Sequence, residues 1–551
     1  MNQEAPAEIN GQATPPAEGK SGQSATGKLQ TDSYAAEHST SWWGRPCGGR
    51  EVLALSVPLV ISSLSWTVMT FIDRMLLNWV SETAMNAAFS AGTTWFAFIC
   101  LPMGICAYAS TFVSQYFGDK QYGKIGPSVG QGVWAAMIAT PLLLAGIPLA
   151  PWIFDLAGHE SALRAAEVTY LQILLWGAPA MLASQALAAF FSGRSRTNVV
   201  MIVDGGSAVI NLALDYIMIF GKFGLPAMGI VGAGWATVIA LWLKFLIYFA
   251  LIARKPNRVR FNTISGLRFH RKLFGRLIVF GGPSGVQFLL DVLGFTVFIL
   301  LVGRLGKLEH AATTMAFSIS TLAFMPIYGL SIAASILVGQ RLVEDKPELA
   351  ARATWTTLTI GISYMACMSL LYIFAPELFL SGFLANSTFL DKETLATTAA
   401  TLLLFVAAYN LFDAMLMIFS AAIKGAGDTR FVLYVSLLMA AILASASWVA
   451  VERLSFGVYG CWNIITAWVC IGGVIYLLRF LQGRWKSMRV IEPRVEDVIE
   501  HPLGGEELDQ IRAGESIDAI AQDKSSTADH REIEHDDTVH SDVAAGATYT
   551  E

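Results

Sequence analysis

The sequence predicts an all-α polytopic membrane protein, with twelve transmembrane helices in two pseudo-symmetric six-helix lobes. Of its 551 residues, 54% are hydrophobic and only 14% are charged, and the mean hydropathy is +0.53. Apolar runs of about 20 residues, the length that crosses the hydrocarbon core as a helix, recur between Glu51 and Arg484. The pattern lacks the ~10-residue alternating segments that are typical of a membrane β-barrel.

Twelve apolar runs are long enough to span a bilayer, and charged or polar residues separate them. An even number of spans places both chain termini on the same side of the membrane. The predicted spans are residues 51–79, 86–115, 126–154, 166–192, 198–220, 229–253, 273–303, 309–339, 350–376, 394–423, 430–451 and 457–481.

The loops on one side of the predicted bundle contain most of the lysines and arginines. The longest of them, residues 254–272, contains seven lysines and arginines with Arg276 just beyond it, whereas the opposite loops contain few. The positive-inside rule therefore predicts that these loops and both termini face the cytoplasm. We expect this segment to anchor the topology and link the halves; the alternative is a patch for lipid headgroups. The other basic residues on this side are Lys120, Lys124, Arg194, Arg196, Arg341, Lys346, Arg352, Lys424 and Arg430.

The two halves of the sequence are weakly similar at a constant offset. Pro58 in the first span matches Pro283 in the seventh, and residues 109–115 match residues 334–340. Each half has six spans, so the two repeats share one orientation in the membrane. Parallel repeats of this kind, related by an axis along the membrane normal, enclose a cavity between them, as in alternating-access carriers.

These patterns divide the chain into five parts. We expect an N-lobe at 43–254, a basic cytoplasmic inter-lobe loop at 255–272 and a C-lobe at 273–488. Polar composition predicts disordered cytoplasmic tails at 1–42 and 489–551, the second of them acidic. The first tail has no basic and apolar regions typical of a signal peptide.

Among the carboxylates inside predicted spans, three stand out: Asp73, Asp291 and Asp413. A carboxylate at mid-bilayer costs roughly 2.5–3.5 kcal/mol, so such residues mark cation, proton or substrate sites. Asp291 and Asp413 have no basic neighbour in their own spans. Asp73 is followed by Arg74, which either neutralises it or extends to the interface.

Neighbouring polar residues extend these acids into one candidate site per lobe. Hard cations prefer carboxylate, amide and hydroxyl oxygens, and a proton needs a buried carboxylate. Asp215 lies near the end of its span, so an exposed helix end is the alternative for this residue. The N-lobe candidates are Asp73, Asn211, Asp215 and Thr237, and the C-lobe candidates are Gln287, Asp291, Tyr409, Asn410 and Asp413.

Five segments together resemble the MATE family, the multidrug and toxic compound extrusion transporters, over roughly residues 50–485. The match is closest in the fifth and sixth spans, where Asn211, Asp215 and the glycine-rich run before Thr237 follow the family pattern. Asp291 departs from it, since related transporters often have Glu there. The segments are residues 71–74, 211–224, 229–237, 409–414 and 424–429.

The resemblance implies two six-helix lobes and a secondary antiporter that exports amphipathic organic cations in exchange for Na⁺ or H⁺. In some members the positions matching the N-lobe set bind the cation, and in others the positions matching Asp291, Asp413 and Tyr409 do so. We expect a monomer in the plasma membrane that binds small organic cations and the lipid bilayer. We expect no nucleic acid, no cofactor, no metal other than Na⁺ at these sites, and no enzymatic activity.

Three other functions compete with the antiporter. A flippase for lipid-linked or polysaccharide precursors needs several cationic residues in its cavity to hold phosphate, and within the spans we count Arg74 and little else. An intramembrane enzyme needs a nucleophile and base or paired metal ligands, and His310 is the one histidine near a span. A facilitating channel fits the two-lobe pattern with buried acids less well than a carrier does.

Overall fold

The computed structural model describes residues 41–492, apart from residues 158, 386–391 and 455. Within these residues the regular structure is entirely helical, with two short 3₁₀ turns between α-helices and a third after the last α-helix. The predicted tails lie almost wholly outside the described residues. The α-helices are α2 (Gly49–Val80), α3 (Glu82–Gly118), α4 (Ile125–Leu144), α5 (Gly146–Ala157), α6 (Ser161–Ser192), α7 (Thr197–Phe220), α8 (Gly229–Ala253), α9 (Lys255–Phe261), α10 (Arg271–Gly303), α11 (Lys307–Val343), α12 (Pro347–Phe374), α13 (Pro376–Ala385), α14 (Lys392–Ala426), α15 (Thr429–Glu452) and α16 (Val458–Leu481).

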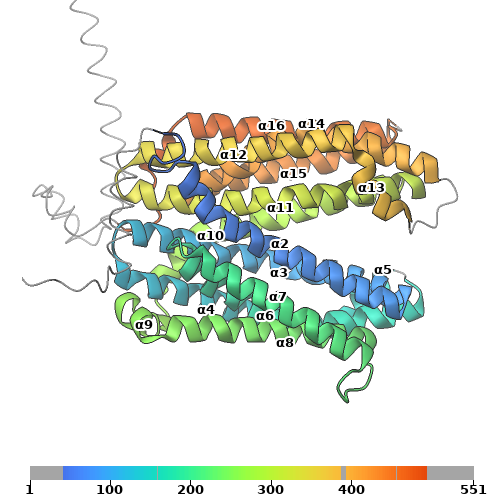
Figure 1. Ribbon diagram of the computed structural model, residues 1–551, viewed down its shortest axis with the longest axis horizontal. Helices are drawn as coiled ribbons and strands as arrows, with labels where there is room; N and C mark the ends of the chain where they lie inside the picture. Colours follow the sequence, from blue (N-terminus) through green and yellow to red (C-terminus); the bar gives the residue numbers. More distant parts are fainter. Residues whose placement is uncertain (1–40, 158, 386–391, 455, 493–551) are drawn as a thin grey trace, which may run out of the picture. The chain divides into compact units, whose positions relative to one another are not determined.

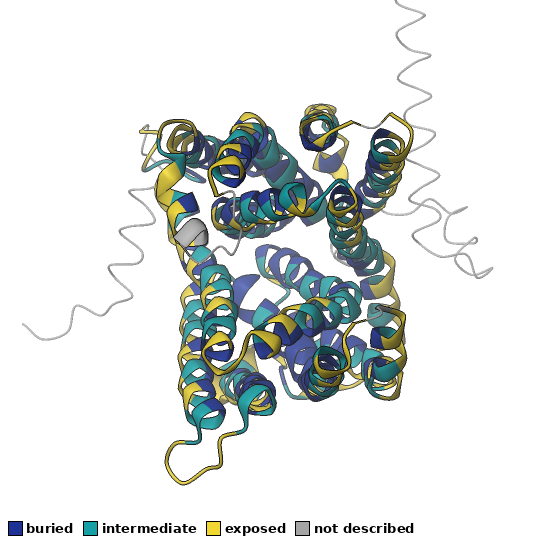
Figure 2. Ribbon diagram, turned by 90° about the vertical axis from the view of Figure 1, so that its right-hand side faces the viewer, coloured by how far each residue is buried: buried dark blue, intermediate teal, exposed yellow. Residues whose placement is uncertain are grey.

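Twelve helices of the described chain are long and apolar enough to cross a membrane, as the sequence predicts. They form two lobes of the same construction, α2–α8 and α10–α16 (Figures 1 and 2). In the N-lobe, α2 packs on α7, α3 on α6 and α6 on α8; in the C-lobe, α10 packs on α15, α11 on α14 and α14 on α16. The predicted pair of pseudo-symmetric six-helix lobes is therefore confirmed.

Two short helices change the predicted span limits. The third predicted span, residues 126–154, is wrong in its second half, because α4 ends at Leu144 and α5 begins at Gly146. Pro148 lies in the first turn of α5, where its missing N–H needs no partner, so the break costs little there. The ninth predicted span, residues 350–376, likewise ends early, and Pro376 begins α13.

The backbones of the two lobes approach each other closely at two equivalent helix crossings. A Cβ on Gly104 of α3 would lie 2.6 Å from the Cα of Gly285 in α10, and a Cβ on Gly329 of α11 would lie 2.8 Å from the main-chain nitrogen of Val60 in α2. The offset that relates Pro58 to Pro283 also relates Val60 to Gly285 and Gly104 to Gly329. The structure is thus consistent with the repeat inferred from the sequence. The glycines at these crossings allow the helix backbones to come into contact.

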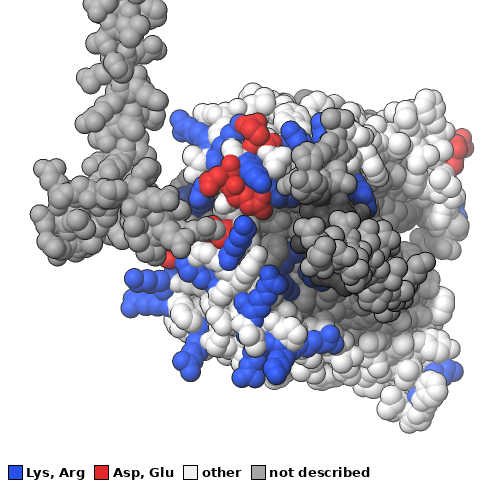
Figure 3. Space-filling view, turned by 60° about the vertical axis from the view of Figure 1, so that its left-hand side comes forward, with Lys and Arg blue, Asp and Glu red and all other residues white. Residues whose placement is uncertain are grey.

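Charged side chains gather at the end of the bundle that holds the inter-lobe segment α9 and the described chain ends; we call this the basic end. Figure 3 shows lysines and arginines over its N-lobe half, and acidic residues mixed with them over its C-lobe half. In the C-lobe half, Asp428 pairs with Arg479 at 2.7 Å, and Glu348 pairs with Lys486 at 2.8 Å.

Candidate functional site

The N-lobe brings its four predicted residues to adjoining helices. Asp73 lies on α2, Asn211 and Asp215 lie one turn apart on α7, and Thr237 lies on α8, which packs against α7. Asn211 and Asp215 are completely buried, and Asp73 and Thr237 are each 8% exposed. Burial excludes the exposed helix end that the sequence left open for Asp215.

These residues present oxygen atoms that have no hydrogen-bond donor. Among the described residues, Asp215 Oδ1 and Oδ2, Asp73 Oδ1 and Asn211 Oδ1 are buried without a partner. The Nδ2 of Asn211 donates weakly to Thr237 Oγ1 at 3.5 Å, and the charges of Asp73 and Asp215 lie close enough to interact. Because unpaired buried acceptors are costly, four of them converging on one region match the ligand set of a cation.

Two neighbours complete the N-lobe cluster. Tyr170 of α6 donates its hydroxyl to Asp73 Oδ2 at 3.1 Å. Tyr170 could not be predicted from the sequence, because an aromatic residue in a span is ordinary and only the packing of α6 brings it to Asp73. Arg74 lies over the ring of Phe89, with Cζ 4.7 Å from the centroid. No ion pair joins Arg74 to Asp73 among the described residues, and the charge of Arg74 acts on that carboxylate only through space.

The surroundings of the C-lobe acid Asp291 differ from those of the N-lobe acids, because a lysine side chain lies near it. Gln287 donates its Nε2 to Asp291 Oδ2 at 2.9 Å and accepts from Lys424 Nζ at 3.0 Å. The Lys424 ammonium also attracts the Asp291 carboxylate directly. The sequence placed Lys424 in a loop, which is wrong: α14 continues to Ala426, and the lysine side chain lies between helices.

The other predicted C-lobe residues do not join this chain of hydrogen bonds. Tyr409 hydroxyl lies 3.4 Å from Ser320 Oγ, and Asn410 donates to Ser369 Oγ at 3.1 Å, which links α14 to α12. Asp413 interacts with Tyr409, but no hydrogen bond or ion pair between described residues joins it to Asp291. The predicted five-residue set is therefore two separate groups.

A third polar cluster in the spans was missed. Asp204 of α7 forms an ion pair with Lys244 of α8 at 2.8 Å, and it accepts hydrogen bonds from Tyr248, at 2.9 Å, and from Ser62 of α2. Both charged side chains are mostly buried, at 12% exposure for Lys244 and 16% for Asp204. A search of the predicted spans for charge alone would have found this pair.

The repeat shows which of these clusters correspond. Ser62 lies four residues after Pro58, and Gln287 lies four residues after Pro283, so the two are equivalent. The Asp204–Lys244 cluster and the Asp291–Lys424 cluster therefore lie at matching depths. Asp73 has no acidic counterpart, since the equivalent position in the C-lobe is Phe298.

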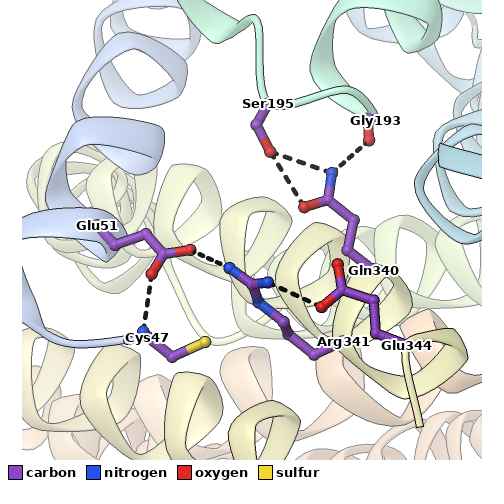
Figure 4. A network of polar contacts seen from close by, with 7 residues as sticks. All are labelled: Cys47, Glu51, Gly193, Ser195, Gln340, Arg341 and Glu344. Atoms are coloured by element: carbon purple, nitrogen blue, oxygen red, sulfur yellow. Dashed lines mark hydrogen bonds and ion pairs between the residues drawn. The ribbon is translucent and has the colours of Figure 1, made fainter. Parts of the chain in front are cut away.

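Hydrogen bonds between the lobes close the basic end. Gln115 of α3 donates to the carbonyl of Gly425 at 3.0 Å, and the equivalent Gln340 of α11 donates to the carbonyl of Gly193 at 2.7 Å. Figure 4 shows the second of these links, where Ser195 also contacts Gln340.

Arg341 adds an ionic link beside these glutamines. It joins Glu51 of the N-lobe at 2.7 Å and Glu344 at 2.9 Å (Figure 4). Cys47 lies next to Glu51, and burial raises the pKa of its thiol to about 11. In the part of the chain that the structure describes, every recorded hydrogen bond between α2–α8 and α10–α16 lies in the half nearer the basic end.

Two homologous lobes of membrane-spanning helices with buried acids define a multi-pass membrane transporter. The MatE family model matches the chain twice, over residues 58–217 and 283–448. The chain belongs to the MATE family of multidrug efflux transporters.

Similar proteins of known sequence cover most of the chain. The multidrug resistance protein MdtK of Proteus mirabilis is 30% identical over 392 residues, which are 70% of this chain and 84% of that protein. The multidrug resistance protein NorM of Aliivibrio fischeri is 30% identical over 421 residues, which are 75% of this chain and 89% of that protein.

Solved structures share the fold at lower identity. The eukaryotic MATE transporter AtDTX14 superposes with a TM-score of 0.71 at 20% identity and covers 79% of this chain and 96% of its own. An outward-facing MATE transporter of the MOP superfamily gives a TM-score of 0.72 at 18% identity, over 80% of this chain and 97% of that one.

Proposed function

We propose that this protein is a plasma-membrane antiporter that exports small organic cations in exchange for Na⁺ or H⁺, which bind at the N-lobe site. The basic end is cytoplasmic in this proposal, as the positive-inside rule predicts. One observation supports the site above all others: four buried oxygens of Asp73, Asn211 and Asp215 lack a donor. Arg74 acts on Asp73 only through space, so a bound cation supplies the positive charge in direct contact with these oxygens.

The electrochemical gradient of the coupling cation supplies the energy for this exchange. Each net positive charge that enters is worth about 2.3 kcal/mol per 100 mV, so a one-for-one exchange of monocations uses the concentration gradient alone. A cation bound at Asp73 and Asp215 shifts the balance between lobe arrangements only if it binds them with different affinity. The lobe contacts at the basic end describe one of these arrangements, closed towards the cytoplasm.

The cationic side chains inside the helices help to compare an antiporter with a flippase. Lys244 and Lys424 increase the number of cationic side chains within the helices beyond Arg74. Lys244 is paired with Asp204 at 2.8 Å, and Lys424 is attached to Asp291 through Gln287. Neither lysine is left uncompensated to hold a phosphate, so organic cations fit the interior better than a phosphorylated lipid does.

Transport in proteoliposomes tests the proposal. Na⁺ and H⁺ gradients are imposed separately, and uptake of ethidium and tetraphenylphosphonium is followed. We expect one gradient to drive uptake and Asp215→Asn to abolish the driven component, because the variant removes a charged ligand. Asp155→Asn is the matched control, since Asp155 is an exposed carboxylate paired with Arg164 on the surface. Equal driven transport by wild type and Asp215→Asn would overturn the N-lobe assignment.

A further inference from the structure

The Asp291 carboxylate has a cation of its own within the C-lobe. Lys424 Nζ donates to Gln287 Oε1 at 3.0 Å, and Gln287 Nε2 donates to Asp291 Oδ2 at 2.9 Å. Both ends of the Gln287 amide are used, so the amide fixes the ammonium and the carboxylate on its two sides. The group is neutral as a whole, whereas Asp73 and Asp215 have no ammonium attached to them.

The backbone of Lys424 is held by the opposite lobe. Lys424 and Gly425 belong to the last turn of α14, where main-chain carbonyls have no partner within the helix. Tyr108 of α3 donates to the Lys424 carbonyl at 2.9 Å, and Gln115 donates to the Gly425 carbonyl at 3.0 Å. Gln115 also accepts from the main chain of Val490, at 2.7 Å. The position of the lysine therefore depends on closure of the lobes at the basic end.

We propose that Lys424 is a tethered competitor for the cationic group of the substrate at Asp291, and that closure of the basic end engages it. The inference rests on the proposed export of organic cations. When the lobes separate at the basic end, the Tyr108 and Gln115 hydrogen bonds break, and the lysine loses the support that keeps it at Gln287. Asp291 then accepts an organic monocation from the cytoplasmic side.

This arrangement helps an exporter to release its substrate. A lower affinity in the outward-facing state favours release to that side, and the coupling cation supplies the free energy that the change of state then needs. A tethered ammonium competes at a high effective concentration that costs no second molecule. On closure of the basic end it takes over Asp291, and the substrate cation is released to the opposite side.

Equilibrium binding to the purified full-length protein tests the inference without any ion gradient. Ethidium, tetraphenylphosphonium and rhodamine 6G are the probes. We expect Lys424→Met to lower the Kd for these monocations about tenfold, because it leaves Asp291 without its internal cation. Lys424→Arg, the matched control, retains the charge and should bind nearly as wild type does. Tyr108→Phe keeps the lysine and weakens only its backbone anchor, so a two- to threefold lower Kd is expected.

A double-mutant cycle separates competition from a general loosening of the fold. In an Asp291→Asn background, Lys424→Met should no longer increase affinity, since the contested carboxylate is gone. Unchanged or weaker binding by both Lys424→Met and Tyr108→Phe overturns the inference, as does an equal effect of Lys424→Met with and without Asp291. Failure of wild type to bind any of the three probes instead overturns the proposed substrate class.

Discussion

The two lobes share a backbone and differ in where they place negative charge. The N-lobe acid Asp73 lies about two helical turns, or roughly 10 Å, farther from the basic end than Asp291 does, when both are counted from the equivalent prolines. Asp73 and Asp215 have buried oxygens without a donor, and Arg74 acts on Asp73 only through space, whereas Asp291 is linked to Lys424 through the Gln287 amide. The N-lobe site is thus suited to a coupling cation from solution, and the C-lobe site to a substrate cation that displaces the Lys424 ammonium. Duplication of the fold did not duplicate the chemistry.

The largest expected effect is a loss of thermal stability when Asp204 or Asp291, the two acids with a lysine nearby, is replaced. Asp204→Asn leaves Lys244 without its ion-pair partner, whereas Asp291→Asn removes a charge that Lys424 meets through Gln287. Breaking a buried ion pair from one side costs about 3–5 kcal/mol, so Asp204→Asn should unfold at clearly lower temperature in detergent, and Asp291→Asn at a less strongly lowered one. The double variant Asp204→Asn with Lys244→Met should recover much of the loss. Wild-type thermal stability in both single variants would show that the lysines do not compensate these acids.

Substitution of an N-lobe acid should change thermal stability in the opposite direction, by raising the unfolding temperature. In Asp215→Asn the new amide supplies donors to the unpaired oxygens of Asp73 and Asn211, at about 1 kcal/mol for each hydrogen bond. We expect a higher unfolding temperature than wild type in buffer without the coupling cation. Wild type should gain stability when that cation is added, because it binds the folded state, and Asp215→Asn should not. A fall in stability on this substitution would contradict an empty, donor-poor site.

How far the sequence predicts this arrangement depends on the residue. Asp73, Asp215 and Asp291 were found because charge inside an apolar run is visible without a structure. Lys424 was not, since hydropathy ended its span one residue early and counted it with the basic loop. Helical spacing joined Asp413 and Asn410 to Tyr409, and they were grouped with Asp291 as acids and amides of the same lobe, yet α14 directs Asn410 towards α12. Spacing along one helix does not show which neighbouring helix a side chain meets.

A smaller effect, on cation affinity, is expected when the hydroxyl of Tyr170 is removed from the N-lobe site. Tyr170→Phe removes the donor to Asp73 Oδ2 and leaves the four unpaired oxygens in place. A hydrogen bond of this kind contributes about 0.5–1.5 kcal/mol, so cation affinity should change only several-fold and driven transport should persist. The measurement is the cation concentration that gives half-maximal driven uptake. Complete loss of transport would make Tyr170 an essential ligand rather than a neighbour of Asp73.

The smallest effect concerns Cys47, where the lobes meet at the basic end. Burial is the main cause of its raised pKa, about 11, and the negative charge of Glu51 raises it further. The thiol is therefore protonated at neutral pH, and maleimide labelling should be slow because the thiolate is the nucleophile. Glu51→Gln removes one raising charge and the partner of Arg341, so labelling at pH 7.5 should become modestly faster. Glu344→Gln is the control, because it removes the other partner of Arg341 while leaving Glu51 in place. If both variants accelerate labelling equally, the cause is the loosening of Arg341 and not the charge of Glu51. If neither variant accelerates labelling, neither Glu51 nor the Arg341 link controls the reactivity of Cys47.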